Sequence, residues 1–137
     1  MELIAPLSAQ IALTLLLLFA MGAARVKAIM KKQVRAKDVA LRQPAWPEQA
    51  TRIGNAFHNQ LETPLLFYVL VIILILTKQA DSTYLYMAWG FVILRVIHAA
   101  IHVSTSLPVA RFYIFVLAST VLTLMWLRFF LIMYGTA

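Results

Sequence analysis

The sequence contains no cysteine and only five acidic residues in 137 positions. The lack of cysteine excludes disulfide bonds, thiolate catalysis by the protein and cysteine-ligated metals. With so few carboxylates, the matched acid pairs of a dinuclear metal centre are missing as well. The chain is too short for several domains and has no soluble portion large enough to bury a core. These absences indicate a single domain over residues 1–137.

Apolar residues dominate what is present. They make up 63% of the chain, and the mean hydropathy of +0.85 lies far above the soluble globular range. Crossing a bilayer as a helix takes about 20 residues, and four apolar segments are long enough. They cover residues 3–30, 47–78, 83–103 and 109–134. Because short loops join them, we predict an all-α integral membrane protein, an antiparallel four-helix transmembrane bundle.

Positive charge is concentrated in the first loop. Seven of the 12 Lys and Arg residues lie between Arg25 and Arg42, with Asp38 as the one acid among them. Beside a membrane span, this segment, residues 25–42, predicts a cytoplasmic loop that contacts anionic lipid headgroups. Nucleic acid is not expected as a partner, because no recognition motif or aromatic platform accompanies the charges.

The basic loop predicts the orientation of the whole bundle. Residues 31–47 and the loop near Arg111 are expected to face the cytoplasm. Both termini and the loop at residues 78–81 are then expected on the other side. No organelle-targeting signal is visible, so a bacterial plasma membrane is the expected location.

A polar segment opens the second span. The apolar run after it, residues 65–76, is only 12 residues long, so the membrane helix must include the polar segment as its first turns. Pro64 predicts a kink just after Glu62, because proline lacks a backbone N–H and crowds the preceding turn. Spacings of three and four place the candidate binding residues on one helical stripe. They are Arg52, Asn55, Asn59 and Glu62, with His58 beside the stripe.

A second polar stripe lies on the third span. Arg95, His98 and His102 follow at i, i+3 and i+7, and Arg111 comes after the next loop. In an antiparallel bundle this stripe returns to the side and depth of the first one. We expect an ion pair between Glu62 and Arg95. Together the two stripes predict a polar cavity that opens toward the cytoplasm and favours an anionic ligand.

Part of this pattern needs no ligand. Asn59, Glu62, Arg95 and His98 are also explained if they simply fasten the second and third spans together. Arg128, near the far end of the fourth span, is expected to extend its side chain toward the headgroups.

Three chemistries compete for the cavity. His98 and His102, at i and i+4, would form a metal site if Glu62 or His58 joined them, but no metal is expected with so few acids. The Ser-Thr-Ser run at residues 104–106 lies near a histidine, yet no glycine elbow or third acid completes a hydrolase site. The third chemistry is the binding of an anionic, peptide-like thiol beside a lipophilic partner. It suits the mixture of arginine, asparagine, histidine and glutamate.

The same residues carry a resemblance to a known family. The chain resembles the MAPEG superfamily at three places: Arg52 with Asn59–Glu62, then Arg95–His98, then Arg111 after the third span. These are membrane-associated proteins in eicosanoid and glutathione metabolism, such as microsomal glutathione transferases. The resemblance covers nearly the whole chain. It implies a left-handed four-helix bundle that forms a homotrimer, with glutathione between neighbouring subunits near the cytoplasmic face.

The resemblance also implies roles for individual residues. Asn59 and Glu62 match residues of the family that contact glutathione. Arg95 matches a buried structural or binding arginine, and His98 matches a position that is often His or Tyr. Arg111 matches the arginine thought to help activate the thiol in the eicosanoid enzymes.

Three positions depart from the family pattern. Asn55 and His58 stand where the eicosanoid enzymes have two further arginines, and His102 stands where they have a tyrosine near the glutathione sulfur. Without a charge-assisted hydrogen bond at such a position, glutathione binds more weakly by about 1–3 kcal/mol. By resemblance, Arg111 and His102 are the candidate catalytic residues. The candidate glutathione-binding residues are Arg52, Asn55, His58, Asn59, Glu62, Arg95 and His98.

Three functions follow as alternatives. The first is a glutathione transferase or peroxidase that acts on lipophilic electrophiles or lipid hydroperoxides. The second, motivated by the missing arginines, is a non-catalytic membrane scaffold that binds lipid or a membrane-protein partner. The third is a metal-dependent enzyme.

Overall fold

The computed structural model describes residues 2–40, 45–104 and 107–135. Arg42 of the basic segment, and residues 105 and 106 of the Ser-Thr-Ser run, lie outside these ranges. All regular secondary structure in the described part is helical. In chain order, the helices are α1 (Ile4–Met30), the short 3-10 helix η1 (Ala36–Asp38), α2 (Glu48–Asn59), α3 (Thr63–Leu76), α4 (Ser82–Ser104) and α5 (Pro108–Tyr134).

Four helical segments are long and apolar enough to cross a membrane. They are α1, α2 together with α3, α4 and α5, with 27, 29, 23 and 27 residues. Each exceeds the length of about 20 residues that a bilayer requires. The predicted four-helix membrane bundle is therefore present.

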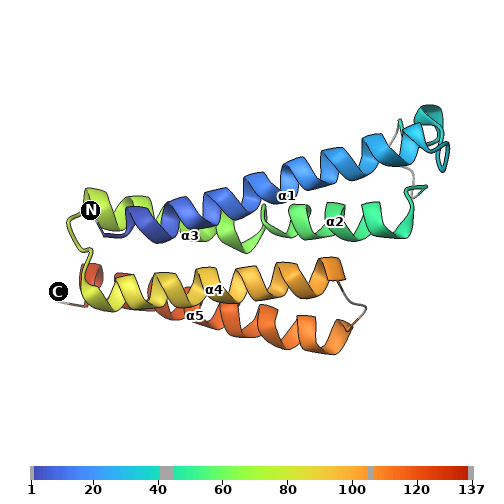
Figure 1. Cartoon of the computed structure of the whole chain (residues 1–137). Helices are drawn as coiled ribbons and strands as arrows, with labels where there is room; N and C mark the ends of the chain where they lie inside the picture. The colour runs from blue at the N-terminus through green and yellow to red at the C-terminus, as the bar shows by residue number, and fades with distance from the viewer. Residues whose placement is uncertain (1, 41–44, 105–106, 136–137) are drawn as a thin grey trace.

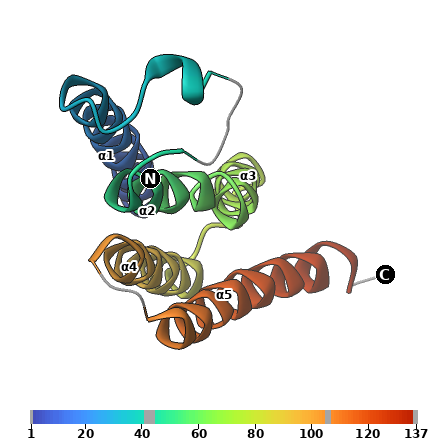
Figure 2. The same cartoon turned by 90° about the vertical axis from the view of Figure 1, so that its right-hand side faces the viewer.

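The helices run alongside one another, with their connections at two opposite ends (Figure 1). The connections from α1 to α2 and from α4 to α5 share one end. The two termini and the connection from α3 to α4 share the other, as predicted from the loops. Viewed end-on, α1 and α2 form one side of the bundle, and α4 lies between them and α5 (Figure 2).

The interior contains two apolar clusters. The larger one lies toward the termini and joins α3, α4 and α5, and it includes Phe67 stacked on Phe91 with ring centroids 4.7 Å apart. The smaller one joins α1, α2 and α4 through Leu17, Ala56 and Ala99. Small residues at such contacts let membrane helices approach closely, which strengthens their packing. This close approach brings the end of α2 against α4.

The second span is broken rather than gently kinked. α2 ends at Asn59 and α3 begins at Thr63, with Glu62 between them at φ −96° and ψ −103°. The predicted kink just after Glu62 was therefore misplaced, because the break precedes and includes this residue. Pro64 lies in the first turn of α3, where its missing N–H costs no hydrogen bond.

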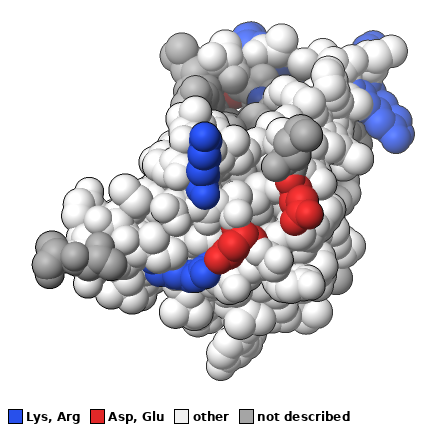
Figure 3. Space-filling view, turned by 90° about the vertical axis from the view of Figure 1, so that its left-hand side faces the viewer, with Lys and Arg blue, Asp and Glu red and all other residues white. Residues whose placement is uncertain are grey.

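Arg128 has a partner that the sequence analysis missed. Its guanidinium donates to both carboxylate oxygens of Asp81 at 2.9 and 2.5 Å and lies 4.3 Å from the ring centroid of Tyr84. The extension of Arg128 toward the headgroups stays a prediction, and the loop before α4 places a carboxylate partner beside this arginine. Figure 3 shows this end of the molecule, where a few charged side chains gather on a mostly uncharged surface.

Candidate functional site

A groove of about 330 Å³ lies where the end of α2 meets α4 and α5. We call it the polar groove. Its walls combine a carboxylate, a guanidinium, an amide and an imidazole with aromatic and apolar side chains. The lining residues are Asn59, Glu62, His98, Pro108, Arg111, Phe112 and Phe115. Charged and hydrogen-bonding groups in an apolar wall are typical of a small-molecule site.

Arg95 lies behind the polar groove and is fully buried. Its Nη2 donates to the backbone carbonyl of Asn59 at 2.8 Å and to Oδ1 of the same residue at 2.7 Å. Asn59 Nδ2 in turn donates to Glu62 Oε2 at 3.3 Å. A hydrogen-bonded chain thus leads from the buried cation to the carboxylate in the groove.

The predicted ion pair between Glu62 and Arg95 is wrong. Among the described residues, the ion pairs within 4 Å are Arg35–Asp38, Arg52–Glu48 and Arg128–Asp81. The break after α2 leaves the carbonyl of Asn59 without a helical partner, and Arg95 binds this carbonyl instead. Glu62 therefore keeps an exposed carboxylate.

His98 and Arg111 line the other wall of the groove, and His102 lies beside Arg111. His98 and His102 are buried, with their ring centroids 5.8 Å apart. Arg111 Nη1 lies 3.5 Å from His102 Nε2. Within the described part of the chain, Nδ1 of both histidines has no hydrogen-bond partner. The α4 stripe and Arg111 therefore meet at one place.

The remaining candidates lie apart from this groove. Arg52 Nη2 donates to Glu48 Oε1 at 2.5 Å in the first turns of α2. Asn55 and His58 are exposed. None of these three residues lines the polar groove. The single chain thus brings together Asn59, Glu62, Arg95, His98, His102 and Arg111.

Comparison with protein families gives a match over residues 3–131, to the MAPEG family. The match spans nearly the whole chain. The chain belongs to the MAPEG family. No curated protein matches it, and no solved structure does either. This MAPEG protein is accordingly an integral membrane protein of the superfamily of glutathione and eicosanoid metabolism.

A metal site finds no support in the same residues. Among the residues described, no three His, Asp or Glu side chains lie close enough to hold a metal ion. Ser104, the described member of the Ser-Thr-Ser run, donates its hydroxyl to the carbonyl of Ala100 at 2.5 Å. That hydroxyl therefore continues the hydrogen bonding of its own helix.

A polar cluster on the opposite side of the break in this MAPEG protein was not predicted from the sequence. Gln10 of α1 donates to Gln60 at 3.0 Å, and both side chains are fully buried. Thr14 and Tyr68 join them through hydroxyls 3.0 Å apart. The available signal was the pair of polar residues, Gln10 and Thr14, at i and i+4 in the first span.

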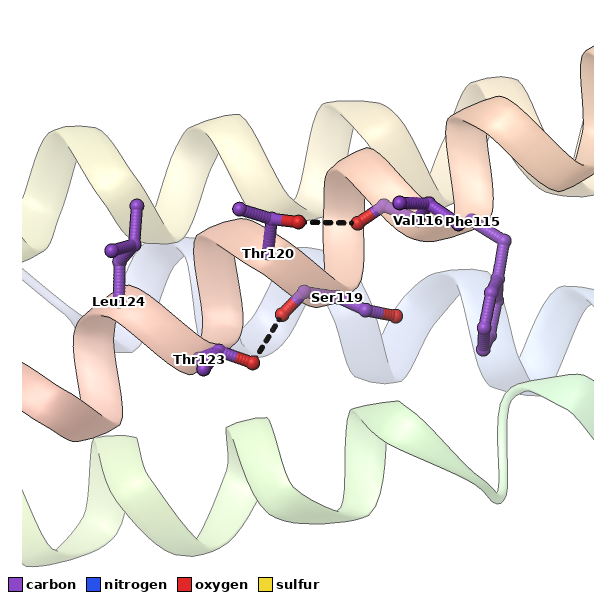
Figure 4. A pocket seen from close by; sticks show the side chains of 6 residues that line it. All are labelled: Phe115, Val116, Ser119, Thr120, Thr123 and Leu124. Atoms are coloured by element: carbon purple, nitrogen blue, oxygen red, sulfur yellow. Dashed lines mark hydrogen bonds between the residues drawn. The ribbon is translucent and has the colours of Figure 1, made fainter.

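A second groove of about 250 Å³ continues along α5 from Phe115, which lines both grooves. We call it the α5 groove. Figure 4 shows the hydroxyls of Thr120 and Thr123 donating to the carbonyls of Val116 and Ser119, at 2.9 and 2.8 Å. These two hydroxyls are satisfied within their own helix, while among the described residues the hydroxyl of Ser119 has no hydrogen-bond partner. The lining of the α5 groove is mainly apolar.

Proposed function

We propose that this MAPEG protein is a glutathione transferase or peroxidase that acts on lipophilic electrophiles or lipid hydroperoxides. The observation that supports this most strongly is the polar groove. Asn59 of α2, Glu62 of the break after it, His98 of α4 and Arg111 of α5 line it, and His102 lies 3.5 Å from Arg111.

The groups in and behind the groove fit the charges of glutathione. Glutathione carries two carboxylates and one ammonium, joined by peptide bonds to a thiol. The exposed carboxylate of Glu62 suits the ammonium, while Arg111 and the buried Arg95 suit the carboxylates. Nε and Nη1 of Arg95 have no hydrogen-bond partner among the described residues. Because Arg95 is fully buried behind the groove, it would favour the carboxylates through its charge rather than through direct contact.

Arg111 and His102 would act on the thiol. The positive charge of Arg111 stabilises a thiolate, and the imidazole of His102 accepts the proton that the thiol releases. In a transferase reaction on an aryl halide, the thiolate bonds to the electrophilic carbon, the carbon–halogen bond breaks, and a thioether and a halide ion leave. In a peroxidase reaction, two glutathione molecules reduce one hydroperoxide to an alcohol and water and leave as a disulfide.

The α5 groove offers a place for the lipophilic acceptor. It adjoins the polar groove at Phe115 and would face the membrane interior, so an acceptor dissolved in the bilayer could approach the thiol from the side. We further propose that the protein assembles as a homotrimer and that a neighbouring subunit closes the groove. Its opening would face the cytoplasm of a bacterial plasma membrane.

The test is conjugation of glutathione to a chromogenic aryl halide, with purified protein in nanodiscs. Wild type is expected to form the conjugate, and Arg111→Ala is expected to lower the rate about a hundredfold or more, because it removes the fixed cation beside the thiolate. Arg35→Ala is the control, since it removes an exposed arginine paired with Asp38. An Arg111→Ala rate equal to wild type would contradict the proposal.

A non-catalytic scaffold is the second candidate. Asn55 and His58, which stand in place of two arginines of the eicosanoid enzymes, are exposed and lie outside the polar groove. Fewer fixed cations mean weaker binding of an anionic tripeptide. Lipid in the groove of a solved structure, or a membrane protein that stays bound through purification, would favour this function.

A further inference from the structure

The residues that hold the break between α2 and α3 lie outside the polar groove. Gln10 Nε2 donates to Gln60 Oε1 at 3.0 Å, and Gln60 Nε2 donates to the carbonyl of Ala56 at 3.3 Å. Both glutamines are fully buried. A buried amide that loses its partner costs more free energy than the bond contributes. The pair therefore favours one arrangement of the last turn of α2.

The same turn of α1 also bonds to α3. The backbone carbonyl of Gln10 accepts hydrogen bonds from Thr14 at 3.0 Å and from Tyr68 at 3.4 Å. α1 thus contacts both halves of the broken span. From the other side, Arg95 of α4 binds Asn59. The break is held between two helices.

The orientation of the break decides where two groove residues lie. Asn59 and Glu62 line the polar groove, while Gln60, between them in sequence, bonds to α1. A rotation of this turn that released Gln60 would also move Asn59 and Glu62. We infer that Gln10 and Gln60 are a positioning pair that orients Asn59 and Glu62 toward glutathione. This inference rests on the proposed function of the groove.

Kinetics of the full-length protein in nanodiscs test the pair. The variants are Gln10→Met, Gln60→Met and the double variant, which keep side-chain length but remove the hydrogen bond. The KM for glutathione is expected to rise about fivefold in all three, with kcat at saturating glutathione within about twofold of wild type. The effect of the double variant should not exceed that of the single ones, because the Gln10–Gln60 bond can be lost only once and the double variant leaves neither buried amide without its partner. Gln49→Met, at an exposed position of α2, is the control and should match wild type.

A second readout does not need glutathione. The N–H groups of Gln60 and Leu61 donate to the carbonyls of Phe57 and His58 at 2.8 and 2.9 Å. Their hydrogen exchange is expected to accelerate in Gln10→Met and to stay unchanged in the control. Should Gln10→Met fail to fold, Gln10→Asn keeps the amide but shortens the side chain beyond reach.

The two readouts separate two kinds of failure. Unchanged exchange in the glutamine variants would overturn the positioning pair, as would an unchanged KM or additive effects of the two substitutions. If wild type shows no glutathione turnover, the proposed function fails. Hydrogen exchange then decides by itself whether Gln10 and Gln60 orient the break.

Discussion

At the scale of single residues, Arg95 carries a charge that is fully buried among membrane helices. An unpaired cation there is costly. Its Nη2 binds the carbonyl and the side chain of Asn59 at the end of α2, where carbonyls lack helical partners and the helix dipole favours positive charge. A helix end therefore accepts the hydrogen bonds of Arg95 Nη2, and the carboxylate of Glu62 stays exposed for a ligand.

Lysine at position 95 is not expected to replace the hydrogen bonds that Arg95 makes to Asn59. Arg95→Lys keeps the charge but removes the guanidinium, whose Nη2 donates to both oxygens of Asn59. We expect it to lower the free energy of unfolding by about 1–3 kcal/mol, because buried hydrogen bonds are broken. Thermal unfolding in detergent measures the change. Arg35→Lys, at an exposed ion pair, should leave the unfolding temperature unchanged, and an equally small effect of Arg95→Lys would contradict the role assigned to it.

At the scale of helices, the spans could be predicted from the sequence but their rotations could not. Hydropathy and loop length are local properties, so the four spans and the grouping of their ends follow from them. The meeting of His98, His102 and Arg111 follows from spacing along α4 and a short loop. By contrast, Glu62 and Arg95 lie at a similar depth in the bundle but do not form an ion pair. The break between α2 and α3 turns Asn59 so that it lies between them and binds Arg95 instead. Linear spacing does not encode that rotation.

The connection between α3 and α4 is held by an ion pair that depends on pH. Hydrogen bonds from Arg128 lower the pKa of Asp81 from 3.8 to about 2, and the backbone N–H of Tyr84 adds to this effect. A carboxyl with a lowered pKa in the folded protein contributes stability that is complete above pH 3.8 and is lost as the pH falls toward 2.

We therefore expect the wild-type unfolding temperature to drop as the pH falls through this window. The Asp81→Asn variant lacks this carboxylate. Its unfolding temperature should therefore be lower than that of wild type at neutral pH and approach the wild-type value as the pH falls toward 2. Thermal unfolding in detergent at a series of pH values measures the difference between the two proteins. A constant difference across the window would show that the pair contributes no pH-dependent stability.

At the scale of the whole molecule, the two ends differ in charge. The end of α1 and the loop after it carry five exposed lysines and arginines: Lys27, Lys31, Lys32, Arg35 and Lys37. The opposite end holds the α3–α4 loop with Lys78 and Asp81. Because positive loops remain in the cytoplasm, this difference predicts the orientation of the bundle and hence the side from which the polar groove is reached.

The absence of cysteine makes that orientation simple to measure. A membrane-impermeant maleimide should label Lys78→Cys in intact cells and Lys37→Cys only in inverted membrane vesicles. Each variant is the control of the other, because they lie at opposite ends of the bundle. Labelling of Lys37→Cys in intact cells would place the polar groove on the wrong side for a cytoplasmic thiol.

Calorimetric titration of the wild-type protein in nanodiscs with glutathione tests the central claim most directly, that the polar groove binds this tripeptide. We expect saturable binding of glutathione at the groove. We also expect Glu62→Gln to weaken the affinity about tenfold, because the ammonium is left without its charged partner. No binding to the wild-type protein even at saturating glutathione would contradict this claim.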